Sequence, residues 1–158
     1  MHIHRLEKLW IIIGTAMLVV FLVAIGIGAY AMGNHPPGHT SSIKLDPEKV
    51  YETPPFDNPG LEKIGENEYN AYIVAYIYGY NPGNIEIPVG ATVHFYVTSA
   101  DVVHGFNIPG TIVNMMAIPG EVNEMTYTFD EPAEYLLLCN EYCGIGHEYM
   151  ATTITVKG

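Results

Sequence analysis

The residues best suited to chemistry lie together in one short segment, residues 139–150. The segment has the spacing CxxxCxxxHxxM and contains the only two cysteines of the chain, so that its donor residues are Cys139, Cys143, His147 and Met150. Thiolate, imidazole and thioether groups suit copper and other soft or borderline metals, whereas magnesium and calcium prefer oxygen. The intervening glycines allow a tight loop that turns several side chains toward one point. The segment therefore predicts a metal site.

A further strong ligand must come from another part of the fold. His104 is the best candidate, because it follows a predicted strand over residues 91–98 and precedes a glycine. Three simpler arrangements are alternatives to a site that holds two copper ions. A disulfide between Cys139 and Cys143 would suit an oxidising compartment, but it would close only three intervening residues and leave the histidine and methionine without a role.

Structural zinc would use both cysteines, His147 and His104, and it would leave Met150 unused. A mononuclear blue-copper site needs one cysteine, two histidines and a weak methionine, so the second cysteine would be surplus. Two coppers bridged by both thiolates use every donor residue.

Short β-branched and aromatic runs, separated by Pro-Gly and Asn-Pro turns, begin near residue 68 and continue to the end of the chain. This pattern is typical of a β-sandwich or barrel. The expected strands cover residues 69–76, 85–89, 91–98, 121–129, 134–139 and 151–157. In the third strand Val93, Phe95 and Val97 alternate with polar residues, which places His94 on the opposite face, where we expect it to be exposed or hydrogen-bonded.

Residues 9–32 form one uncharged apolar run that is long enough, at about 1.5 Å per residue, to cross a bilayer as a helix. Arg5 and Lys8 precede it, so we expect residues 1–8 in the cytoplasm and the rest of the chain outside. A cleaved signal peptide, with Ala29-Tyr30-Ala31 as the cleavage site, is the alternative. The run is much longer than the apolar core of a signal peptide, which favours an uncleaved anchor.

Residues 33–67 are rich in proline and turn residues, which predicts a surface linker between the anchor and a domain over residues 68–158. His35 and His39 lie in this linker, but the Pro-Pro-Gly between them prevents a helical pair of ligands. Beyond residue 32 the chain has sixteen acidic residues, four lysines and no arginine, a formal charge of −12. Nucleic acid is therefore a poor partner.

His104 together with CxxxCxxxHxxM, on a late loop of a small β domain, resembles the CuA domain of cytochrome c oxidase subunit II. The resemblance covers about residues 68–157. It implies a cupredoxin-like Greek-key β-sandwich with a binuclear copper centre. In that centre Cys139 and Cys143 would bridge the two coppers, His104 and His147 would be the imidazole ligands, and Met150 and the backbone carbonyl of Glu141 would be the weak axial ligands.

Two departures refine this resemblance. A single anchor, instead of the usual two-helix hairpin, is similar to the short subunit II of B-family haem-copper oxidases in prokaryotes. The family's usual tryptophan for electron transfer is absent, since Trp10 is the only tryptophan and lies in the apolar run. In the position of the family's aromatic segment, Tyr78 or else Tyr76 would be the contact where electrons enter; the alternative is that these rings only pack against or cover the domain. Some family members also bind magnesium at the residue matching Glu141, but one carboxylate alone does not form an octahedral site.

The resemblance implies that the chain accepts electrons from a soluble cytochrome c or a small copper protein and passes them to haem in subunit I for oxygen reduction. Two alternatives remain at this point. One is the CuA subunit of a nitric oxide reductase. The other, from a different class, is a membrane-anchored copper-binding or chaperone protein, although a closed set of six donors favours retention of the metal over its release.

Overall fold

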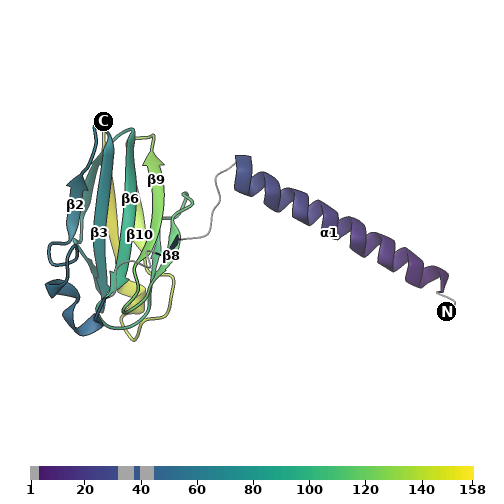
Figure 1. The fold of residues 1–158 in the computed structure, drawn as a ribbon, viewed down its shortest axis with the longest axis horizontal. Coiled ribbons are helices and arrows are strands. Elements are labelled where there is room, and N and C mark those ends of the chain that lie inside the picture. The colour runs from purple at the N-terminus through teal and green to yellow at the C-terminus, as the bar shows by residue number, and fades with distance from the viewer. Residues whose placement is uncertain (1–3, 32–37, 40–44) are drawn as a thin grey trace. The chain divides into compact units, whose positions relative to one another are not determined.

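The computed structural model describes residues 4–31, 38–39 and 45–158. The chain divides into two compact units, residues 1–36 and 37–158 (Figure 1). The first unit contains one helix, α1 (Arg5–Ala31), which is long and apolar enough to cross a membrane. It begins four residues before the predicted start at Leu9, because the flanking charged segment continues the helix. The predicted end at Met32 lies outside the described residues.

The second unit is a two-sheet β-sandwich of the cupredoxin type. One sheet has the strand order β1-β9-β6-β3-β2, with β4 also paired to β3, and the other has the order β5-β11-β10-β7-β8. The strands are β1 (Gly38–His39), β2 (Gly60–Lys63), β3 (Glu68–Tyr76), β4 (Gly79–Asn81), β5 (Ile85–Pro88), β6 (Ala91–Ser99), β7 (His104–Asn107), β8 (Asn114–Ala117), β9 (Asn123–Phe129), β10 (Glu134–Leu138) and β11 (Ala151–Lys157).

Apolar side chains from the facing sides of the two sheets form the main core. Phe95 of β6 contacts Phe106 of β7 with ring centroids 5.5 Å apart, and Phe129 of β9 lies 6.2 Å from Phe95. All three rings are fully buried. The alternation predicted for residues 91–98 is confirmed, because Val93, Phe95 and Val97 are buried while the residues between them are partly exposed or lie on the outer face.

His94 lies on the outer face, as its place in that alternation predicts. Its Nδ1 atom is 2.7 Å from the Thr126 hydroxyl and its Nε2 atom is 3.0 Å from the Glu68 carboxylate. His94 is therefore a hydrogen-bonded strand residue. His35 lies outside the described residues, and His39 is in the short strand β1, which pairs with β9.

The described part of the predicted surface linker, residues 45–67, contains regular structure that packs against the sheet. A 3-10 helix, η1 (Pro47–Glu52), and strand β2 lie within it, and β2 pairs with β3. Val50 and Phe56 are buried in a second, smaller core on the outer side of β3, where Phe56 contacts Tyr72 edge-on. The segment is rich in proline and turn residues and is irregular, but it covers the sheet. It does so because its few apolar side chains pack in one buried cluster with Val74 and Val122.

The six predicted strands all appear as β3, β5, β6, β9, β10 and β11, with ends shifted by at most two residues. The five remaining strands of the described residues, β1, β2, β4, β7 and β8, are four residues or shorter. Such short strands show little alternation of polar and apolar residues, and whether they form depends on tertiary pairing. Two of them, β7 and β8, lie beside the predicted metal site.

Candidate metal centre

The loop of residues 139–150 joins β10 to β11, which are antiparallel neighbours in one sheet. The backbone N–H of Cys139 donates to the carbonyl of Met150 at 3.1 Å, which closes the base of the loop. A 3-10 turn, η2 (His147–Tyr149), shortens its second half. The loop therefore has a fixed start and end, and its donor residues are constrained to one small region.

The sulfur atoms of the loop lie close together in the interior. Cys139 Sγ and Cys143 Sγ are 3.8 Å apart and unbonded. Cys143 Sγ is also 3.5 Å from His147 Nδ1 and 3.6 Å from Met150 Sδ. Cys139, Cys143 and Met150 are buried, whereas His147 is partly exposed. The structure thus brings all four donors of the sequence motif around one point.

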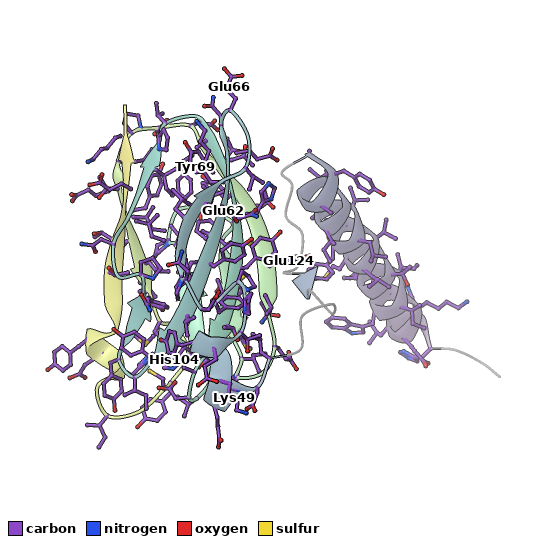
Figure 2. All side chains as sticks on the ribbon, turned by 60° about the vertical axis from the view of Figure 1, so that its left-hand side comes forward. Lys49, Glu62, Glu66, Tyr69, His104 and Glu124 are labelled. Carbon is purple, nitrogen blue, oxygen red and sulfur yellow. The ribbon has the colours of Figure 1, made fainter. Side chains whose placement is uncertain are left out.

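His104, the first residue of β7, joins the two cysteines. One ligand atom from each of His104, Cys139 and Cys143 lies within 4.8 Å of the others, and the His104 side chain is fully buried. Its Nδ1 atom has no hydrogen-bond partner. An orphaned imidazole nitrogen buried beside two sulfurs is costly unless a further group satisfies it, and a metal ion would do so. Figure 2 shows His104 near one end of the sandwich, with Glu66 at the other.

Asp101 holds the His104 ring. His104 Nε2 lies 2.7 Å from Asp101 Oδ1, and the carboxylate also accepts hydrogen bonds from the backbone N–H groups of Ile77 and Val102. Burial alone would raise the pKa of Asp101, but these three donors outweigh it and the pKa is lowered. An ionised Asp101 accepts a hydrogen bond from Nε2–H and leaves Nδ1 as the nitrogen that is free to bind a metal.

Replacing Asp101 with Asn should therefore weaken metal binding by about 10–100-fold, the usual cost of losing a carboxylate behind a histidine ligand. Competition with a chelator of known affinity would measure the loss. Asp57→Asn, which neutralises an exposed aspartate outside the group of His104, Cys139 and Cys143, is the charge-matched control. Equal metal affinities for the two variants would show that Asp101 does not support metal binding.

Gly105 makes a close approach to the loop that no other residue would permit. A Cβ atom there would lie 2.5 Å from the backbone nitrogen of Asn140 and 2.9 Å from that of Glu141. The Gly105 N–H donates to Cys139 Sγ at 3.2 Å, and the Tyr80 hydroxyl donates to the Gly105 carbonyl at 2.6 Å. The glycine after His104 thus brings β7 against the cysteine loop.

Tyr78 covers the loop from the outside. A Cβ atom on Gly144 would lie 2.8 Å from the Tyr78 hydroxyl, and a Cβ atom on Gly146 would lie 2.6 Å from the Tyr78 ring, so both positions favour glycine. Gly144 also has a φ of +132°, which side chains rarely adopt. Tyr78 is 39% exposed and Ile145, between the two glycines, is 93% exposed. An aromatic ring therefore joins the surface directly to the cysteine loop.

The two remaining predicted residues differ in their relation to the sulfurs. The Glu141 carbonyl oxygen is 3.0 Å from Cys139 Sγ, which places it at the edge of the sulfur cluster. The Glu141 side chain is exposed. Tyr76, at the end of β3, is 40% exposed, and its hydroxyl lies against Gly79 rather than the cysteine loop. Tyr78 is therefore the better candidate for an electron-accepting contact.

The electrostatics of the sulfur cluster favour a bound cation. Burial raises the pKa of the Cys143 thiol to about 11, and the neighbouring Cys139 sulfur acts in the same direction. Burial, followed by the charges of Cys139 and Cys143, also raises the pKa of Tyr80. A bound cation would compensate the charge of the Cys143 thiolate, so metal binding at this sulfur must release a proton and its apparent affinity must rise with pH.

Sequence reasoning did not assign roles to Asp101, Gly105 and Asn140. Asp101 has a signal in the sequence, since it precedes His104 by three residues, but that spacing has no fixed meaning outside a helix. Gly105 and Asn140 are separated by 35 positions, and only the pairing of Leu138 in β10 with Asn107 in β7 places them together. Their contact depends on tertiary structure alone.

The donors present fit copper. Two thiolates, two imidazoles and a thioether form a soft, largely buried set, and His104 Nδ1 is buried without a hydrogen-bond partner. The fold and this set of donors together define a copper protein of the cupredoxin type.

Comparison with known proteins places the chain within this class. Residues 81–157 match the family described as cytochrome c oxidase subunit II, periplasmic domain. Cytochrome c oxidase subunit 2 of Thermus thermophilus is 42% identical over 156 residues, which cover 96% of this chain and 91% of that protein. The chain belongs to the cytochrome c oxidase subunit II family.

A more distant relative is the probable cytochrome c oxidase subunit 2 of Rickettsia prowazekii, 28% identical over 92% of this chain and 48% of that protein. A cryo-EM structure of a haem-copper terminal oxidase dimer contains a similar chain, with a TM-score of 0.82 and 33% identity, covering 97% of this chain and all of that one. The periplasmic domain of subunit II from Bradyrhizobium japonicum, at a TM-score of 0.52 and 23% identity, shares the fold.

These findings support the expected class of protein. The chain is a component of an oxidoreductase complex, subunit II of a haem-copper oxidase, and other oxidase subunits are its partners. The one apolar helix in the described residues and the periplasmic-domain family indicate a single-pass membrane protein with an extracytoplasmic domain.

Proposed function

We propose that this chain accepts electrons from a soluble donor at a binuclear copper centre of the CuA type and passes them to haem in subunit I for oxygen reduction. The observation that carries the proposal is the meeting of two unbonded cysteine sulfurs, 3.8 Å apart, with the orphaned Nδ1 of His104 in a buried cluster. When bound, the copper pair supplies a reversible one-electron redox step.

The residues of the chain have separate tasks in this proposal. Cys139 and Cys143 would hold the two coppers through their thiolates, His104 and His147 would supply the imidazole nitrogens, and Met150 and the Glu141 carbonyl would be the weaker ligands. The β10–β11 frame fixes both ends of the loop, so the donor atoms shift little when the electron arrives. Burial of the sulfurs excludes water from the site.

The amount and electronic state of bound copper test the proposal. The full chain, purified in detergent and reconstituted with copper, should bind two coppers, and the oxidised form should show electron paramagnetic resonance hyperfine splitting from two equivalent nuclei. One copper with coupling to one nucleus would establish a mononuclear site. Zinc bound in preference to copper, without a paramagnetic signal, would overturn the proposal as well.

Tyr78 is proposed as the contact through which electrons enter, because its exposed ring lies on the cysteine loop. Tyr78→Ala should slow reduction by the donor, by about tenfold if the ring supplies one hot-spot contact, while the copper content stays at two. Stopped-flow reduction measures this rate. Tyr78→Phe keeps the ring and removes the hydroxyl, so it should react like the unaltered chain. Slowing by Phe as severe as by Ala would assign the effect to the hydroxyl instead.

The donor is proposed to be a soluble cytochrome c or a small copper protein. The strongly acidic composition of the chain beyond residue 32 would attract a basic donor over long distances. The helix is proposed to cross a prokaryotic cell membrane with Arg5 and Lys8 on the cytoplasmic side. Protease added to right-side-out spheroplasts should then digest the copper domain, whereas protection from it would reverse the orientation.

A further inference from the structure

The side chain of Asn140 ties the cysteine loop to a strand that contributes no ligand. Asn140 directly follows Cys139, and its Nδ2 donates to Oδ1 of Asn114 in β8 at 3.0 Å. Asn114 pairs with Asn107 of β7, and Leu138, just before the loop, pairs with the same Asn107. The first residues of the loop are therefore fastened to the β7–β8 hairpin by a side chain as well as by the sheet.

This fastening holds Gly105 against the loop from several sides. The side-chain oxygen and the backbone nitrogen of Asn140 both lie where a Cβ atom on Gly105 would be. The Tyr80 hydroxyl fixes the Gly105 carbonyl. The Gly105 N–H is then directed at Cys139 Sγ, at a distance of 3.2 Å. The hydrogen bond to the sulfur thus depends on how closely the Asn140 backbone approaches Gly105.

A hydrogen bond to a thiolate draws negative charge away from the sulfur and weakens its donation to a metal. The oxidised, more positive state of a metal centre loses more from this than the reduced state. The bond from Gly105 to Cys139 should therefore favour reduction. Cys139 receives this bond from another strand, whereas the His147 and Met150 contacts of Cys143 come from the same loop.

We propose that Asn140 and Asn114 are positioning residues that hold the Gly105 N–H on Cys139 Sγ and thereby raise the reduction potential of the centre. The part that concerns the potential rests on the function proposed above. The part that concerns the N–H···S bond does not depend on that function, because the bond is present in the metal-free protein. The two parts are therefore tested by different measurements.

The hydrogen bond is tested in the metal-free, reduced full chain in detergent. Amide hydrogen exchange at Gly105, followed by NMR, should be faster by about fivefold in Asn140→Ala and in Asn114→Ala, the factor that corresponds to the loss of one ordinary hydrogen bond. The double variant should exchange no faster than either single variant, because both residues act through one contact. Asn114→Asp keeps an acceptor oxygen for Asn140 Nδ2 and should preserve the protection.

The potential is tested in the copper-loaded full chain. Asn140→Ala should lower the midpoint potential with the copper content unchanged, and the intensity of sulfur-to-copper charge-transfer absorption should change with it. Asn67→Ala is the matched control, because Asn67 is an exposed asparagine just before the start of β3, at the opposite end of that strand from Tyr76 and the aromatic segment. Its potential should equal that of the unaltered chain.

Unchanged exchange at Gly105 in both alanine variants would overturn the proposal. Faster exchange with an unchanged potential would overturn it too, since the contact would then serve only the fold. If the unaltered chain binds fewer than two coppers, the proposed function fails, and the exchange measurements on the metal-free chain still decide whether Asn140 and Asn114 hold the Gly105 N–H.

Discussion

Replacing either Cys139 or Cys143 by Ser should abolish the two-copper centre. The two sulfurs lie 3.8 Å apart, and each is proposed to bridge both metals, so one remaining bridge does not hold a pair. We expect copper content to fall from two to one or none, and the shared hyperfine pattern to disappear. Metal analysis and electron paramagnetic resonance of the purified chain measure both changes.

Met150→Leu is the matched control for these variants. Met150 is also buried and lies 3.6 Å from Cys143 Sγ, and leucine has a similar volume. Because a thioether is a weak ligand, this variant should keep two coppers and show mainly a shifted potential. A chain that retains two coppers and the shared signal after loss of either cysteine would contradict the binuclear assignment.

Gly105→Ala should have the second largest effect. A new Cβ atom would meet the backbone nitrogens of Asn140 and Glu141 at 2.5 and 2.9 Å, and the backbone does not rotate away as a side chain would. Overpacking of this kind costs about 1–3 kcal/mol of unfolding free energy. The displaced loop should also separate Cys139 from His104, so copper retention should fall by more than about tenfold, the factor for 1.4 kcal/mol.

Thermal unfolding followed by circular dichroism, together with chelator competition, would measure these losses. Gly83→Ala is the control, because a Cβ atom there meets its nearest atom at 3.9 Å and the residue adopts an ordinary φ. It should leave both quantities nearly unchanged. A Gly105→Ala chain as stable and as copper-retentive as Gly83→Ala would show that the loop accommodates a side chain at this point.

The sequence by itself predicts the apolar helix, strand β6 with its buried face, and the cluster of soft donor residues. The uncharged run before residue 32 predicts the helix, because hydrophobicity and length need no tertiary information. Alternation over residues 91–98 predicts β6 and its buried face, since the side-chain period of a strand is local. The spacing from Cys139 to Met150 predicts a cluster of soft donors, because a short loop keeps them near one another.

Other features depend on the arrangement of distant segments. Residues 45–67 have the composition of a linker, yet Phe56 and Val50 are buried because a hydrophobic cluster on the outer side of β3 needs to be covered. Local composition does not show where a few apolar side chains find partners. The strands β7 and β8 are similarly too short to be recognised until they pair.

The surroundings of the metal site are decided in the same way. His104 is a candidate from its type and neighbours, but only the tertiary structure buries it beside the cysteines, pairs its Nε2 atom with Asp101 and leaves Nδ1 without a partner. Gly105 and Asn140 meet because β7 and β10 pair across a long stretch of sequence. The sequence thus determined which donor atoms are available, because ligand chemistry follows from residue type. The tertiary structure decided which of their hydrogen bonds orient them, because those partners come from strands that only folding brings together.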